Sequence, residues 1–349
     1  MNSADASERA APKNPLLRRL RAFFFCGCLG LGIGYAVWGP IFNVDPSASR
    51  HKKCATNYRF VNPEPDCETL EATIGRMRDA EQEADAIGTR ALEDGKVTRA
   101  SVFSRDLTTL QYVGINERSL YSPASLLKIP LMVAYLKYAE TNPDVMHTML
   151  TYPGGDDLNS AQQLQTFESK SSLQVGQAYS VENLIERMIK YSDNNATSLL
   201  LASIDQGFLE RTFLELGIKI PREHVNTTRD FVTTVSFAAI FRTLYNSSYL
   251  SRESSEKALA LLSKSTFDQG IRSILPAHTP LVEKYGERTV LDETGKLALR
   301  ELHECGIVYA ENRPFTFCVF TEGKNFEDML STLRDIEKAL YKNEVSGNT

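Results

Sequence analysis

The pair of residues best suited to chemistry is a serine and a lysine three positions apart, Ser125 and Lys128. On a helix, side chains at this spacing share one face and can touch. The lysine could then take the serine proton, provided that burial or nearby cations lower its pKa. Pro130 is tolerated best if the helix begins near Ser125, which places the serine at the positive end of the helix dipole. The spacing therefore predicts a serine nucleophile activated by a lysine.

The S-x-x-K pattern alone is weak evidence, because it arises by chance in a chain of this length. Ser49–Lys52 and Ser254–Lys257 repeat it in polar surroundings. Ser125 is preferred because an apolar stretch, Ile129 to Tyr138, follows it and predicts a buried helix. The pair would then lie at the edge of a core.

A second candidate element is the polar run Tyr191–Thr197, which contains Ser192, Asp193 and Asn194 between apolar helical segments. As a structural element it is a helix junction with Ser192 or Asp193 as the N-cap. As a functional element it supplies Ser192 as a proton shuttle and Asn194 as a contact for a substrate amide. The sequence leaves both interpretations open.

A third element should supply a cation at a strand edge. Lys284 follows the apolar pair Leu281–Val282 and precedes Tyr285 and Gly286. A substrate carboxylate would bind such a cation, although an ordinary surface lysine fits the pattern equally well. The competing segment Glu293–Gly295 has an acid at the position where the cation belongs.

In this order the three elements resemble the S-x-x-K, S-D-N and K-T-G signature of class A β-lactamases and penicillin-binding proteins. The resemblance extends from about Val97 to Tyr341 and includes the segment His303–Gly323. It implies that Ser125 is acylated, that Lys128 activates it and that Ser192 relays protons. It also implies that Asn194 and Lys284 bind the substrate, and that the backbone N–H groups of Ser125 and Glu287 form the oxyanion hole.

Two departures from the family pattern matter. Tyr285 stands where a threonine or serine is expected, so a hydroxyl that usually binds the substrate carboxylate is moved or lost. No E-x-x-L-N loop follows the second element; residues 226–230 (Asn-Thr-Thr-Arg-Asp) occupy its place. The glutamate of that loop activates the deacylating water, so we expect slow turnover of the acyl-enzyme. Glu223, Asp230 and Glu287 remain candidates for a replacement base.

Composition excludes several classes of protein. A net charge of −5 and the absence of a basic stripe with aromatic residues argue against nucleic-acid binding. The five histidines are scattered, and the six cysteines lack metal-site spacing, so we expect no metal and no cofactor. Cys54–Cys67 and Cys305–Cys318 could each form a disulfide or remain as thiols.

The segment 22–44 has no charged residue and is long enough to cross a bilayer as a helix, which takes about 20 residues. Lys13, Arg18, Arg19 and Arg21 precede it, which predicts a cytoplasmic N-terminus. A cleaved signal peptide is the alternative, but residues 39–42 (Gly-Pro-Ile-Phe) do not resemble a cleavage site. We therefore expect a single-pass protein of the bacterial inner (cytoplasmic) membrane with its catalytic domain on the periplasmic side.

The expected organisation is a cytoplasmic segment 1–21, an anchor 22–44, a linker 45–67 and one domain 68–349. Helices are expected at about 68–92, a stretch rich in Glu, Ala and Arg, and at about 326–341, where the pattern is amphipathic. Strands expected at 97–103, 109–115, 281–285, 305–309 and 315–320 flank a long helical region, with a turn around Arg105 and Asp106 between the first two. They predict an α+β fold in which both chain ends (68–124 and 270–349) build one antiparallel sheet. An all-α subdomain, 125–269, would be inserted between them, with the active site at the junction.

The leading functional hypothesis is a serine hydrolase or transpeptidase that acts on β-lactams or on the D-Ala-D-Ala peptides of peptidoglycan. The alternative is a catalytically retired module of the same fold that binds the cell wall from its membrane anchor. The natural substrate and the oligomeric state do not follow from the sequence.

Overall fold

The protein is described from a computed structural model over residues 70–159, 166–167, 172–220, 230–310 and 313–345. The expected anchor 22–44 and the linker with Cys54 and Cys67 lie outside these residues, so both remain predictions. Within the described ranges, no helix combines the length and the apolar character needed to cross a bilayer.

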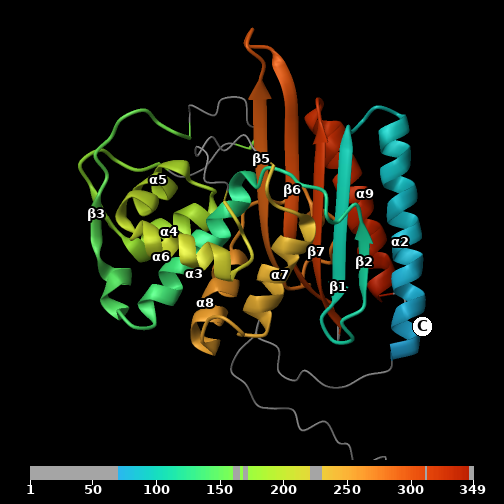
Figure 1. Ribbon diagram of the computed structural model, residues 1–349, viewed down its shortest axis with the longest axis horizontal. Helices are drawn as coiled ribbons and strands as arrows, with labels where there is room; N and C mark the ends of the chain where they lie inside the picture. The colour runs from blue at the N-terminus through green and yellow to red at the C-terminus, as the bar shows by residue number, and fades with distance from the viewer. Residues whose placement is uncertain (1–69, 160–165, 168–171, 221–229, 311–312, 346–349) are drawn as a thin grey trace, which may run out of the picture. The chain divides into compact units, whose positions relative to one another are not determined.

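Five antiparallel strands form the main sheet, in the order β2-β1-β7-β6-β5 (Figure 1). They are β1 (Arg99–Asp106), β2 (Tyr112–Ile115), β5 (Leu281–Leu291), β6 (Leu297–Ala310) and β7 (Arg313–Gly323). β1 pairs with β7, with Val102 opposite Val319, so that the first and last strands of the domain are neighbours. The expected sheet built from both ends of the chain is confirmed.

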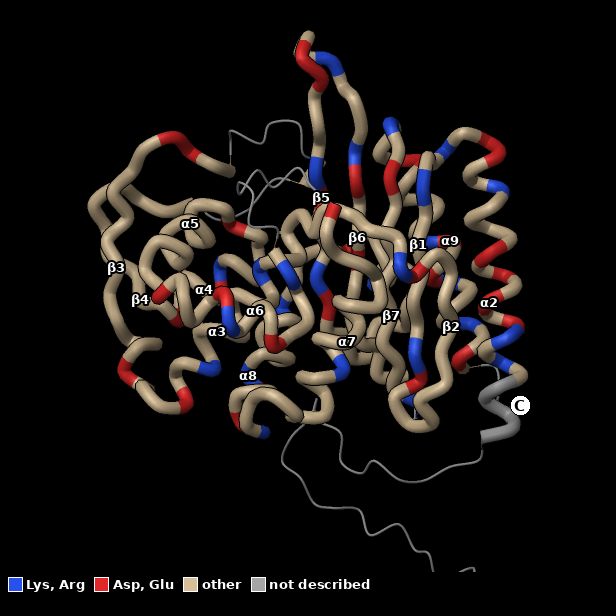
Figure 2. The backbone as a smooth tube through the Cα atoms, viewed as in Figure 1, with Lys and Arg blue, Asp and Glu red and all other residues tan. Residues whose placement is uncertain are grey.

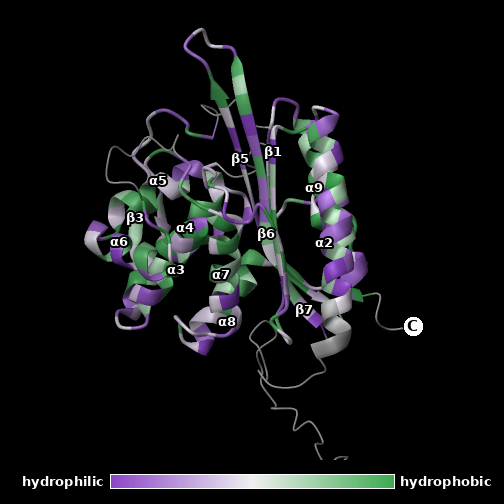
Figure 3. Cartoon of the chain, turned by 45° about the vertical axis from the view of Figure 1, so that its right-hand side comes forward, coloured by the Kyte–Doolittle hydropathy of each residue, from purple (hydrophilic) through white to green (hydrophobic). Residues whose placement is uncertain are grey.

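Helices cover both faces of this sheet (Figures 1 and 3). On one face, α2 (Leu70–Glu93) packs against α9 (Phe326–Val345), which contacts β7 and β6. Apolar residues of α9 recur every three or four positions, as a helix with one buried face requires. The buried apolar members are Phe326, Met329, Leu330, Leu333, Ile336, Ala339 and Leu340.

The other face carries the inserted helices. These are α3 (Lys128–Ala139), α4 (Val181–Lys190), α5 (Asn194–Ser203), α6 (Gln206–Glu215), α7 (Thr234–Tyr245) and α8 (Arg252–Leu262). The insertion is not all-α as expected, because β3 (Met149–Thr151) and β4 (Ala178–Ser180) pair within it. Each of these strands has three residues, which is too short for the alternating pattern that reveals a strand in a sequence.

The turn between the first two strands was also predicted in the wrong place. β1 continues through Arg105 and Asp106, where we expected the turn. The Asp106 carboxylate instead accepts hydrogen bonds from the backbone N–H groups of Thr108 and Thr109, at 2.7 and 2.8 Å. An aspartate that bonds the backbone two and three residues later starts a turn, so the reversal follows Asp106.

β5 is the edge strand that lies beside the helical insertion, and its residues alternate between two cores. Val282 packs with the helices of the insertion, whereas Leu281 and Tyr285 pack with the core beneath α2 and α9. By this alternation Lys284 and Gly286 belong to the same face as Val282. The strand therefore presents Lys284 toward the insertion, at an edge where we expected a cation.

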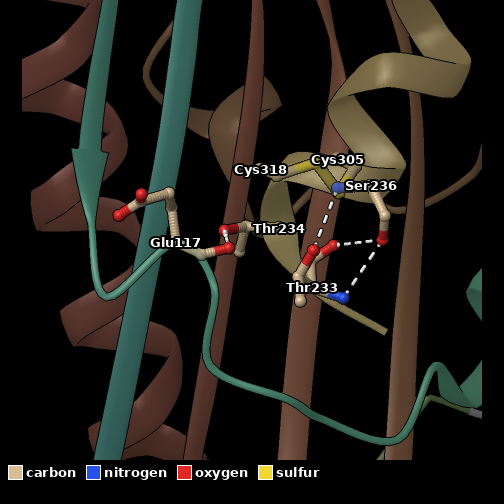
Figure 4. The surroundings of a disulfide bond; sticks show 6 residues. All are labelled: Glu117, Thr233, Thr234, Ser236, Cys305 and Cys318. Carbon is tan, nitrogen blue, oxygen red and sulfur yellow. Dashed lines mark hydrogen bonds between the residues drawn. A yellow bond between two sulfur atoms is a disulfide. The ribbon is translucent and has the colours of Figure 1, made fainter. Parts of the chain in front are cut away.

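A disulfide joins Cys305 of β6 to Cys318 of β7, which are direct partners in the register. α7 packs on both strands, and Figure 4 shows the disulfide near the first turn of this helix. In that turn Thr233 and Ser236 form a capping box. Between the two alternatives left open by the sequence, the structure has the bridge.

Replacing both cysteines by alanine should lower the free energy of unfolding by about 2–4 kcal/mol, because the bridge restricts the unfolded chain. Urea unfolding of the variant and the parent measures the difference. Addition of a thiol reductant to the parent should reproduce the loss, and a parent unaffected by complete reduction would contradict the account.

Candidate active site

Ser125 and Lys128 lie at the junction of two helices of different type. Ser125 is in a short 3₁₀ helix, η1 (Ala124–Leu127), and Lys128 is the first residue of α3. Pro130 is therefore in the first turn of α3, where its missing N–H breaks no helical hydrogen bond. Residues 128–136 of this helix are buried, which confirms the expected apolar helix behind the pair.

The amine of Lys128 is surrounded by oxygen atoms from two of the three predicted elements. Its Nζ lies 3.1 Å from Ser125 Oγ and 2.9 Å from Ser192 Oγ. It donates to the backbone carbonyl of Ser192 at 2.6 Å and to Asn194 Oδ1 at 2.8 Å. The first and second elements thus meet at a single nitrogen atom.

This environment favours a neutral amine. Burial lowers the pKa of Lys128 well below its ordinary value, the charge of Lys284 lowers it further, and Asp193 acts in the opposite direction. A neutral amine has two N–H groups and one lone pair. Its N–H groups can serve the carbonyl of Ser192 and the amide oxygen of Asn194, which leaves the lone pair for a hydroxyl proton. Lys128 is therefore placed to deprotonate Ser125.

The second element is a helix junction with an N-cap, and it also brings Ser192 and Asn194 to the Lys128 amine. Asp193 is the N-cap of α5, accepting from the N–H groups of Asn195 and Ala196 at 2.9 and 3.0 Å. Ser192 has a positive φ of 56°, a conformation that costs energy for a residue with a Cβ. With Asp193 directed into the helix, the residues on either side of it contact Lys128.

Sequence reasoning missed Asn159, which holds this element in place. Its Oδ1 accepts from the N–H of Asn194 at 2.8 Å, and its Nδ2 donates to Asp193 Oδ1 at 3.0 Å. Nearby, Asn195 Nδ2 donates to Asp157 Oδ1 at 2.6 Å. The turn-rich composition of residues 152–159 was the available signal, but a contact between positions 35 residues apart leaves no local pattern.

The third element reaches the site from β5. Lys284 is fully buried, and its Nζ lies 4.2 Å from the centroid of the Tyr285 ring while donating to the Tyr285 carbonyl at 3.0 Å. Tyr285 stacks on Phe267, with ring centroids 4.6 Å apart. Burial raises the pKa of Tyr285, as do the carboxylates of Glu287 and Glu283, while a hydrogen bond with Ser192 acts in the opposite direction.

Gly286 allows β5 to approach the nucleophile closely. A Cβ atom at this position would lie 3.2 Å from both the backbone N of Ser125 and the carbonyl O of Pro123. Glu287 follows, and its carboxylate accepts from the N–H groups of Thr166 and Phe167 at 2.7 and 3.2 Å. The glycine thus brings the peptide groups of Ser125 and of β5 together, as an oxyanion hole requires.

The competing sequence matches lie away from this site. Lys257 on α8 pairs with Glu253 at 3.1 Å and is exposed, and Ser49–Lys52 lies outside the described residues. Glu293–Gly295 forms an exposed turn in which Asp292 accepts from the N–H of Thr294. That turn is the tip of the β5–β6 hairpin, where acidic and basic residues gather (Figure 2).

The three candidates for a replacement base differ in their surroundings. Asp230 forms an ion pair with Arg99 at 3.1 Å, and Arg99 covers the ring of Tyr121. Burial raises the pKa of Glu287, although hydrogen bonds from Thr166 and Phe167 counter it. Glu223 lies outside the described residues. No cluster of His, Cys, Asp and Glu within the described part could hold a metal ion.

Comparisons with known proteins give one family match and a set of solved structures with the same fold. A family model described as "Beta-lactamase enzyme family" matches residues 82–343. A search of curated proteins returns no match.

Solved structures with the same fold include a class A β-lactamase from Mycobacterium abscessus, at 19% identity and a TM-score of 0.61, covering 75% of this chain and 98% of that one. A β-lactamase from Sphaerobacter thermophilus matches at 18% identity and a TM-score of 0.62, with 76% and 98% coverage. The L158E mutant of PBP-A, solved as an acyl-enzyme complex with penicillin G, matches at 16% identity and a TM-score of 0.61, with 75% and 95% coverage.

The pH dependence of any reaction at Ser125 should reflect Lys128. The rate should fall as the pH drops through the lowered pKa of this lysine, because the ammonium form cannot accept a proton. Lys284→Met removes a charge that holds this pKa down, so the acidic inflection should move to higher pH. Labelling of Ser125 by a serine-reactive probe across a pH series measures the inflection.

Lys137→Met is the matched control, because Lys137 lies on the same helix and bonds Glu140 and the Tyr249 carbonyl instead. The same inflection in the parent and in Lys284→Met would contradict the electrostatic coupling of the two lysines.

Proposed function

We propose a function from the premise that this chain belongs to the beta-lactamase enzyme family and is a serine hydrolase. It forms an acyl-enzyme on Ser125 with β-lactams or with the D-Ala-D-Ala peptides of peptidoglycan. The observation that carries the proposal is the position of the Lys128 amine. It is buried, its pKa is well below the ordinary value, and it lies 3.1 Å from Ser125 Oγ.

In the proposed acylation, Ser125 Oγ attacks the amide carbonyl and its proton passes to the neutral Lys128 amine. The negative charge on the carbonyl oxygen is stabilised by the N–H groups of Ser125 and Glu287. The tetrahedral intermediate then collapses as the C–N bond breaks. The leaving nitrogen takes a proton from Ser192, which Lys128 restores. Ser192 is suited to this relay because its Oγ lies 2.9 Å from Lys128 Nζ.

The proposed substrates share an amide carbonyl beside a carboxylate. Lys284 supports this choice, since a buried cation beside the reactive serine favours an anionic group. Asn194 would contact the substrate amide. Its Oδ1 already accepts from Lys128, so its Nδ2 is the group that could donate to a substrate carbonyl.

We expect the acyl-enzyme to be long-lived. Deacylation needs a base that activates water beside the ester. Asp230 is paired with Arg99, and the Glu287 carboxylate accepts from two backbone N–H groups. Both carboxylates are thereby engaged away from Ser125, which supports slow hydrolysis.

We further propose that residues 22–44 anchor the domain to the inner membrane, with the catalytic part on the periplasmic side. The uncharged apolar run and the preceding basic residues support this location. Peptidoglycan would then be within reach of Ser125.

A catalytically retired binding module is the second candidate, and the surroundings of Lys284 favour it. The Lys284 amine contacts the Tyr285 ring and carbonyl, so it is engaged by the residue that replaces the expected threonine or serine. Such a module would bind the cell wall without reacting.

Incubation of the purified full-length chain with penicillin G should add the mass of the intact penicillin to the protein. Ser125→Ala should show no adduct, because it lacks the nucleophile. Intact-mass spectrometry over time gives the yield and lifetime, and we expect the adduct to persist for minutes or longer.

Ser254→Ala provides the matched control, since Ser254 and Lys257 repeat the spacing on α8, where Ser254 is half-buried and Lys257 is exposed. An adduct in this variant and none in Ser125→Ala identifies the nucleophile. Complete absence of adduct in the parent would favour the binding module, and clearance within seconds would contradict slow deacylation.

A further inference from the structure

The backbone of Ser122, three residues before the nucleophile, is held by two side chains of β6. Glu301 Oε1 accepts from the Ser122 N–H at 3.3 Å. His303 Nε2 lies 3.0 Å from the Ser122 carbonyl oxygen. A carbonyl oxygen only accepts, so the imidazole donates through Nε2. Glu301 and His303 are two positions apart on a strand and therefore point to the same face.

Both side chains are themselves fixed in position. The Glu301 carboxylate is fully buried and accepts from Arg288 Nε at 2.6 Å. His303 is also fully buried; its ring stacks on Phe320 at 4.2 Å and meets the Tyr121 ring edge-on at 5.6 Å. Burial lowers the pKa of His303 to about 3, so the ring is neutral near pH 7 and carries a single N–H.

The short connection from Ser122 to Ser125 transmits this restraint. Pro123 has a ring-restricted φ of −70°, and Ala124 has a positive φ of 46°. Because these two consecutive residues have restricted or strained backbone angles, the segment between Ser122 and Ser125 can adopt few other conformations. Fixing the Ser122 peptide therefore limits where the Ser125 hydroxyl and N–H can point.

The other end of the connection is limited by β5. Gly286 is the register partner of His303, and a Cβ at Gly286 would lie 3.2 Å from Ser125 N. Glu301 is likewise the partner of Arg288. The nucleophile turn thus rests on two adjacent strands, with Ser122 bonded to β6 and Ser125 against β5.

We propose that Glu301 and His303 are positioning residues for acylation, which hold the Ser122 peptide so that Ser125 keeps its hydroxyl at Lys128 and its N–H at the oxyanion. The inference rests on the proposed acyl transfer at Ser125. Neither side chain touches the reacting atoms, and both act through the Ser122 peptide. Misplacement of reacting groups by about 1 Å can reduce a rate about 100-fold.

Two substitutions of His303 in the full-length chain test the proposal. His303→Phe keeps a ring to stack on Phe320 but has no N–H, whereas His303→Gln keeps an amide donor. The limiting rate of adduct formation with penicillin G should fall about 10- to 100-fold in His303→Phe, with about the same half-saturating concentration. His303→Gln should recover most of the rate.

Thr321→Val is the matched control for a purely structural effect. Thr321 Oγ1 donates to the Leu302 carbonyl at 2.8 Å in the same sheet, so the variant also loses one buried bond between side chain and backbone. It should lower thermal stability as His303→Phe does while leaving the acylation rate within about threefold of the parent. The proposal would be overturned if the acylation rates of His303→Phe and Thr321→Val both fell in proportion to their losses of thermal stability.

Amide hydrogen exchange separates this inference from the proposed function. Exchange of the peptide covering residues 122–127 should be about 10-fold faster in His303→Phe than in the parent, and unchanged in Thr321→Val. If the parent forms no adduct, the proposed acylation is refuted. The exchange rates of residues 122–127 then show, without any reaction, whether His303 restrains the Ser122 peptide. Unchanged exchange in His303→Phe would overturn the positioning role.

Discussion

The contact on which the site depends is that of one buried amine, Lys128 Nζ, with Ser125, Ser192 and Asn194. An ammonium ion buried at this position would be costly without an anionic partner. The groups that bond to the amine are instead hydroxyl, carbonyl and amide oxygens; the charge of Lys284 lowers its pKa further, and Asp193 opposes this only in part. Such an environment favours the neutral form, which is the form that can take a proton from a serine.

This contact needs three segments that are distant in sequence. Ser125 and Lys128 come from η1 and the start of α3, the second element from the α4–α5 junction, and Lys284 from the edge strand β5. Positive φ angles at Ala124 and Ser192 place local strain on both sides of the amine. Strain and a buried lysine both reduce stability, and the large cores on the two faces of the sheet offset that loss.

The fold was largely predictable because its signals are local. Composition predicted α2, a long apolar run predicted α3, an amphipathic pattern predicted α9, and short apolar segments predicted the strands of both chain ends. The errors came from features with weak local signals, such as the three-residue strands β3 and β4. The turn after Asp106 was misplaced because its aspartate continues the strand before it starts the reversal.

The reactive residues of the candidate site were predictable from the spacing of Ser125 and Lys128 and from the order of the three elements along the chain. Ser125 and Lys128 do meet the residues on either side of Asp193, whereas the match at Ser254 lies on α8, where Lys257 pairs with Glu253. The groups that hold these residues were not predictable. Asn159, Glu301 and His303 act through contacts with positions 35 to 181 residues away, and such pairs leave no pattern in one sequence.

The protonation of Lys128 tests the central claim most directly. In protein labelled with ¹³C at the lysine ε-carbon, its NMR signal can be assigned by comparison with Lys128→Met and followed through a pH titration. The account predicts a midpoint well below the ordinary lysine pKa, because burial and the charge of Lys284 disfavour the ammonium form. A midpoint near the ordinary value, about 10.4, would contradict the assignment of Lys128 as the base.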